Sequence, residues 1–147
     1  MGTFEFTEDQ DSLRETVRAF TERTFPEAEV RRLMAAPSAL ERPVWERMAG
    51  ELGLQGLVVP EEHGGAGAGA VELAIVLEEF GRRLVPAPFL ATALATLALT
   101  AGDPAVTAAP LADIAEGRTV ATVALAEEDG RWEAHGVRCT AAEAAPD

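Results

Sequence analysis

The segment best suited to bind a ligand is the glycine-rich stretch Glu61-Glu62-His63-Gly64-Gly65-Ala66-Gly67-Ala68-Gly69. Glycine loops that lead into a helix cradle phosphates with their backbone N–H groups. A P-loop, however, needs a Lys and a hydroxyl residue after its last glycine, where this chain has Ala70-Val71. A Rossmann fingerprint needs a small residue where Glu72 stands, and Pro60 intrudes before the glycines. The residues therefore favour a tight, mobile connector between two helices over a nucleotide site.

Metal ligands and nucleophiles are scarce in the rest of the sequence. Glu61, Glu62 and His63 are adjacent, so their side chains point in different directions. His135 and Cys139 lack further ligands at metal-binding spacing. No Ser or Cys stands in a recognisable nucleophile elbow. We expect neither a metal site nor hydrolase chemistry.

Composition narrows the classes of partner. The 147 residues suffice for one domain with a core, and 25 acidic against 12 basic residues give a formal charge of −13. Such a field repels phosphate backbones and anionic lipid, so neither a nucleic acid nor a membrane is expected as a partner. The single cysteine, and an N-terminus without an apolar stretch, are typical of a cytoplasmic protein.

The elements that must position any site are mostly helices. Thr7 and Gln10 form a capping-box pattern ahead of apolar residues at helical spacing. The segment from Phe89 to Thr100 is apolar on every face, which predicts burial between other helices, and Gly102-Asp103-Pro104 should end it. The pattern predicts five helices, over Glu8–Thr24, Pro43–Leu52, Val71–Arg83, Phe89–Thr100 and Pro110–Gly117.

The periodicity changes after Gly117. The stretch from Thr119 to Ala126 is rich in Val and Thr, Glu128-Asp129-Gly130 predicts a turn, and Trp132, Val137 and Cys139 continue with a two-residue period. We therefore expect a mainly α fold: an N-terminal helical bundle of about five helices over residues 1–117, followed by a truncated β hairpin region over residues 118–147. A two-stranded remnant leaves open edges, so we expect a fragment of a longer protein.

Four blocks follow one another along nearly the whole chain. They are Phe6-Thr7-Glu8-Asp9-Gln10, the stretch from Trp45 to Leu54, Val59-Pro60-Glu61-Glu62-His63-Gly64-Gly65-Ala66-Gly67 leading into Val76-Leu77-Glu78-Glu79-Phe80-Gly81, and the stretch from Leu111 to Gly117. In this order they resemble the acyl-CoA dehydrogenase family, from its N-terminal domain to the start of its middle β domain. The Pro-Glu-Glu-His-Gly-Gly block is the most specific of the four.

The resemblance implies an FAD-dependent oxidoreductase that removes two hydrogens from adjacent carbons of an acyl-CoA thioester. In this family a carboxylate takes the α-proton and flavin N5 receives the β-hydrogen as a hydride. The family's glutamate base lies in a C-terminal helical domain that nothing here matches, so we expect no catalytic residue in this chain and no turnover from it alone. The N-terminal domain lines one wall of the acyl pocket, which implies substrate binding by Phe89, Leu90, Ala93 and Leu94. Packing in the helical core is the alternative role for each of them.

The family's flavin-contacting strand corresponds here to Leu125 and Ala126, where the sequence departs from the pattern. Family members carry Thr-Glu-Pro followed by Gly and Ser, whereas this chain has Ala126, Glu128 and no following serine. The lost hydroxyl donors weaken the expected flavin contacts. Two hypotheses stand: a subunit of an FAD enzyme in a homo- or hetero-oligomer, and a non-catalytic, non-flavin-binding partner subunit. A stand-alone helical interaction module is a third.

Overall fold

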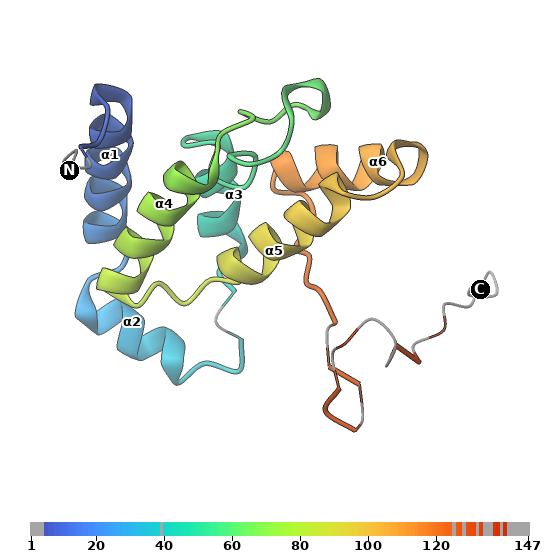
Figure 1. Ribbon diagram of the computed structural model, residues 1–147. Coiled ribbons are helices and arrows are strands. Elements are labelled where there is room, and N and C mark those ends of the chain that lie inside the picture. The colour runs from blue at the N-terminus through green and yellow to red at the C-terminus, as the bar shows by residue number, and fades with distance from the viewer. Residues whose placement is uncertain are drawn as a thin grey trace.

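The computed structural model describes residues 5–38, 40–124, 126–127, 129–131, 133, 137–138 and 140. Within these residues the chain forms six α-helices and one short 3-10 helix, and no β-strand. In chain order they are α1 (Glu8–Thr24), α2 (Glu27–Met34), α3 (Arg42–Gly50), η1 (Glu61–His63), α4 (Ala70–Arg83), α5 (Phe89–Thr100) and α6 (Pro104–Ala115). Figure 1 shows α1 beside α4, and α5 beside α6. The predicted helical fold is confirmed.

Helix α1 begins where the capping box predicted. The Thr7 hydroxyl accepts the Gln10 N–H at 3.2 Å, and the Gln10 side chain accepts the Thr7 N–H at 3.1 Å. These two bonds satisfy donors that a helix N-terminus otherwise leaves unpaired. The opposite end closes on Phe25, whose N–H donates to Thr21 O at 2.8 Å.

The main core draws one or two side chains from each of the first five helices. Its largest fully buried members are Trp45, Phe20, Leu33 and Met48. Phe80 of α4 packs against Phe89 of α5, with ring centroids 4.9 Å apart and the rings tilted by 58°. Edge-tilted aromatic pairs of this kind add to the free energy of simple burial. Phe89, the first residue of α5, therefore holds the start of this helix in the core.

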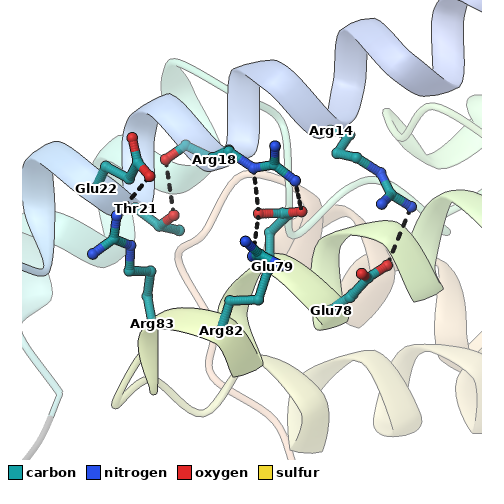
Figure 2. Close-up of polar contacts among 8 residues, drawn as sticks. All are labelled: Arg14, Arg18, Thr21, Glu22, Glu78, Glu79, Arg82 and Arg83. Atoms are coloured by element: carbon teal, nitrogen blue, oxygen red, sulfur yellow. Dashed lines mark hydrogen bonds and ion pairs between the residues drawn. The ribbon is translucent and has the colours of Figure 1, made fainter.

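A row of polar pairs joins α1 to α4 along their length. Gln10 donates to Glu72 at 2.7 Å near the start of both helices, and Arg83 donates to Glu22 at 2.6 Å near their ends. The order of these pairs shows that the two helices run parallel. In the middle of the row, Arg18 binds Glu79 with two hydrogen bonds, Nε to Oε2 at 3.0 Å and Nη2 to Oε1 at 2.7 Å (Figure 2).

Glu79 is the buried member of this row, with a side chain 1% exposed against 40% for Arg18. The hydrogen bonds from Arg18 hold the pKa of the Glu79 carboxyl below its ordinary value, because they favour the charged form; burial acts in the opposite direction. A carboxyl with a lowered pKa in the folded state adds stability above its unfolded-state pKa of about 4.3, and this contribution disappears as the pH falls through the folded-state pKa.

We therefore expect Glu79→Gln to lower the free energy of unfolding at pH 7 and to flatten its decline on acidification below about pH 4.3. Glu78→Gln is the matched control, since the Glu78 side chain is 51% exposed in its pair with Arg14. Urea titrations from pH 3 to pH 7 measure both variants. An acid decline as steep in Glu79→Gln as in the unsubstituted chain would contradict this assignment.

The glycine-rich segment is folded back on the residues that precede it. The N–H groups of Ala66, Gly67 and Ala68 donate to the carbonyls of Gly56, Val59 and Leu57 at 2.8–2.9 Å. Gly65 N–H donates to Pro60 O at 3.2 Å. The predicted tight turn is present, and these bonds use the amides of Gly65 to Ala68, which a phosphate site would need free.

Two further predictions need correction. Helix α2 was not predicted, because its eight residues bury only Val30 and Leu33, too few to establish a period. The predicted end of α5 before Pro104 is confirmed, but α6 begins at Pro104 and runs through Pro110, whereas the sequence predicted that the last helix starts at Pro110. Asp103 explains the early start, since its carboxylate caps Ala105 N–H at 2.9 Å.

The predicted β hairpin region is described only in part. Residues after Gly117 that the structure describes form no strand, although Gly130 N–H donates to Glu127 O at 2.8 Å in the predicted turn. Trp132, His135 and Cys139 lie outside the described residues. The domain boundary placed at residue 118 stays a prediction.

Candidate functional site

Helix α5 is half buried and half open, which corrects the prediction that it is buried on every side. Phe89 and Ala93 face the core and are 3% and 6% exposed. Leu90, Leu94 and Leu97 are 52%, 47% and 47% exposed. Their spacing places these three leucines on one face of the helix, which we call the open leucine face. Uniform apolar composition does not reveal which face is covered, so the sequence alone could not make this distinction.

The four predicted substrate-binding residues therefore divide into two pairs. Phe89 and Ala93 pack into the helical core, as the alternative role for them proposed. Leu90 and Leu94 lie on the open leucine face, where an apolar group can contact them. Contiguous exposed apolar side chains of this kind usually mark a binding surface.

A shallow groove runs beside the second half of α5. It has a volume of about 570 Å³ and is walled by α5, by the start of α6 and by the chain that follows α6. Its lining is mostly small and apolar: Ala95, Ala98, Leu99, Gly102, Thr107, Ala121, Thr122, Val123 and Ala124. The groove lining contains no carboxylate and no basic group, and its polar side chains are the two threonines, so apolar contact is the main interaction that it offers. Volumes of about 300–1,000 Å³ accommodate small-molecule ligands.

The chain after α6, which we call the connector (residues 118–124), is held against the helices at two places. Gly117 has a left-handed φ of 72°, and a Cβ there would lie 2.6 Å from Ala49 Cβ. The indole N–H of Trp45 donates to Gly117 O at 3.1 Å, in a buried contact. Further on, the Thr92 hydroxyl donates to Ala121 O at 3.1 Å and accepts Ala121 N–H at 3.4 Å. Sequence reasoning missed Trp45 and Thr92 because their partners lie 72 and 29 residues away.

The residues predicted to meet a flavin are only partly described. Leu125 lies outside the described residues, and Ala126 is exposed. The methyl side chain of Ala126 has no hydrogen-bond donor, and the N–H of the next residue, Glu127, already donates to Arg131 O at 2.9 Å. The described part of this stretch therefore does not fit the hydroxyl and backbone contacts that a flavin needs, and we derive no step through that cofactor.

The described residues also bear on metal binding and on membrane insertion. No group of three or more His, Cys, Asp or Glu side chains is placed there to hold a metal ion. No helix in that part of the chain is both long and apolar enough to cross a membrane.

Comparison with known proteins gives consistent matches. The model of the acyl-CoA dehydrogenase N-terminal domain matches residues 7–118. Acyl-CoA dehydrogenase IpdE2 of Mycolicibacterium smegmatis is 38% identical over 117 residues, which are 80% of this chain and 37% of that protein. Acyl-CoA dehydrogenase FadE34 of Mycobacterium tuberculosis is 43% identical over 84 residues, which are 57% of this chain and 11% of that protein. This chain thus spans little more than a third of the length of IpdE2 and about a tenth of that of FadE34.

Two solved structures share the fold. A variant of the Tcur3481-Tcur3483 steroid ACAD superposes with a TM-score of 0.76 at 31% identity, covering 82% of this chain and 33% of that one. The ChsE4-ChsE5 complex from Mycobacterium tuberculosis superposes with a TM-score of 0.78 at 27% identity, covering 88% of this chain and 36% of that one. Both are assemblies of two differently named subunits.

Proposed function

This chain belongs to the acyl-CoA dehydrogenase family, as its N-terminal domain, and we propose that it forms one wall of the acyl pocket in a larger enzyme of that family. The reaction proposed for the enzyme is the α,β-dehydrogenation of an acyl-CoA thioester. The open leucine face of α5 is the observation that carries the proposal, because Leu90 and Leu94 are uncovered in a helix otherwise anchored in the core. The base and the cofactor would come from residues outside those described here.

We also propose that the acyl group is broad rather than slender. Alanine and glycine line most of the neighbouring groove, so its two walls stand apart without large side chains between them. Apolar contact with such walls is non-directional and grows with the area buried, which suits a rigid ring system. One of the two solved relatives is described as a steroid ACAD, which supports this substrate class.

The test is to place a charge on the open leucine face of the natural enzyme. We expect Leu94→Glu to lower kcat/KM for acyl-CoA by about 10- to 100-fold, because it removes a leucine contact and sets a carboxylate against the acyl group. Val106→Glu is the matched control, since Val106 is 72% exposed but belongs to α6 and not to the open leucine face of α5. Size-exclusion chromatography confirms that both variants assemble. An assembled Leu94→Glu enzyme with unchanged kcat/KM would overturn the proposal.

A second candidate function is a partner subunit that completes the pocket of a different, flavin-bearing subunit. The absence of a donor on Ala126 favours it, and both solved relatives are named as pairs of unlike subunits. Flavin absorbance per assembled complex separates the two candidates. A ratio of one flavin for every two unlike subunits supports the partner role, and one flavin in every subunit contradicts it.

A further inference from the structure

Thr92 occupies an unusual place among the polar residues of α5. Its side chain is 2% exposed, and its hydroxyl forms hydrogen bonds with the backbone of the connector. The hydroxyl donates to Ala121 O and accepts Ala121 N–H, so it meets both backbone polar groups of one residue. A hydroxyl has one donor and two acceptor positions, which makes both contacts compatible.

The next polar residue on the helix behaves differently. Thr96 is also buried, at 0% exposure, but its hydroxyl donates to Thr92 O within α5 at 2.9 Å. Thr100 repeats this local pattern one turn later. Bonds of this local kind satisfy a buried hydroxyl without holding another segment. Thr92 therefore ties two parts of the chain together, whereas Thr96 supports only its own helix.

The contact stands at the point where the groove begins. Ala121 is the first connector residue in the groove wall, which continues to Ala124. Ala95 and Ala98 form the facing wall on α5, within two turns of Thr92. Trp45 already fixes the connector where it leaves α6, at Gly117. With both ends of residues 117–121 held, the distance between the groove walls depends on the Thr92 contact.

We propose that Thr92 is a positioning residue: its hydroxyl fixes the connector against α5 and so sets the width of the groove and the breadth of acyl group it accepts. The second half of this statement rests on the proposed function, and the first half does not. No chemical step is assigned to Thr92, since it acts through the backbone of Ala121.

Hydrogen exchange of the full chain tests the positioning role without any activity measurement. We expect Thr92→Val to accelerate exchange at the Ala121 amide of the connector by about five- to tenfold, because Val keeps the shape and removes both hydrogen bonds. Thr92→Ser should restore protection, and Thr92→Ala should repeat the effect of Val. Thr96→Val is the matched control, with unchanged exchange in the connector. Equal acceleration by Thr92→Val and Thr96→Val, or failure of Thr92→Ser to restore protection, would overturn the proposal.

Substrate selectivity in the assembled enzyme tests the consequence for the groove. The ratio of kcat/KM for a polycyclic acyl-CoA to that for a straight-chain acyl-CoA should change by about three- to tenfold in Thr92→Val and stay constant in Thr96→Val. An unchanged ratio together with faster connector exchange would overturn the link to the groove and leave the positioning role standing. Failure of the proposed function would show separately, as an unchanged kcat/KM in the assembled Leu94→Glu enzyme.

Discussion

Gly65→Ala is expected to remove a large part of the stability of the domain. A Cβ at this position would lie 2.1 Å from Val59 O, 2.5 Å from Val59 Cβ and 2.6 Å from Gly56 O. Two of these three atoms belong to the backbone, so no side-chain rotation relieves the overlap. The loop would have to open, and with it the hydrogen bonds that hold it to Gly56 and Val59. A loss above about 4 kcal/mol is expected, against a total stability of about 5–15 kcal/mol for a domain of this size.

The neighbouring glycine supplies the control. Gly64 has a φ of 83°, and a Cβ there meets no atom within 4 Å, so Gly64→Ala should cost only the left-handed strain of about 1–2 kcal/mol. Urea unfolding followed by circular dichroism measures both variants. A Gly65→Ala midpoint equal to or above that of Gly64→Ala would show that the close packing of Gly65 against Val59 is wrong.

Trp45→Ala should be the most damaging substitution in the helical core, with an expected loss of about 3–5 kcal/mol in the free energy of unfolding. The Trp45 side chain is 1% exposed and is the largest fully buried side chain. Its removal leaves a cavity between α3 and the core, and it also leaves Gly117 O without its indole donor. The two losses act on different parts of the molecule, the core and the start of the connector.

Trp45→Phe separates these two losses, because it keeps most of the buried ring area and removes the N–H donor. We expect a smaller cost of about 1–3 kcal/mol, from the unpaired Gly117 carbonyl and the lost indole volume. Equilibrium urea unfolding measures both variants against the unsubstituted chain. Equal losses in Trp45→Phe and Trp45→Ala would mean that the hydrogen bond to Gly117, and not the ring, accounts for the stability.

Local signals made the long helices predictable. The capping box at Thr7 and Gln10 sets the start of α1, and Pro26 follows its end, so both bounds agree with the structure. The uniform apolar run from Phe89 to Thr100 set both bounds of α5. Each of these signals involves residues within four positions of one another, which is the range over which helices are specified.

The errors arose where one local signal has two meanings. Asp103 and Pro104 follow the end of α5, as predicted, but they are also the N-cap and the first helical residue of α6, and this second role was missed. An internal proline is costly in a helix, so Pro110 was interpreted as a start although α6 passes through it. Deciding between such meanings requires knowing what packs on the segment, which the residues alone do not state.

The candidate site was less predictable than the fold for a related reason. The resemblance of the sequence to the family predicted a site at the start of α5. Two of the four residues predicted there, Leu90 and Leu94, are exposed and can contact a ligand. Which two are open depends on the packing of Phe89 against Phe80, a contact with α4. Thr92 carries no motif at all, since its role follows from one contact with a residue in a different segment.

The parallel pairing of α1 with α4 has a consequence for the timing of synthesis. The paired residues of the two helices lie 61 to 64 positions apart, so α1 is made well before its polar partners exist. At about 5–20 residues per second, a ribosome needs roughly 3–12 s to add that length of chain. During this interval the side chains of α1 that later pair with α4, such as Arg18, are hydrated. Helix α1 then has only contacts within its own segment to stabilise it. The emergence of α4 is thus the event that supplies the polar partners of α1, and a pause in translation before α4 would lengthen the exposure of the first helix to chaperones.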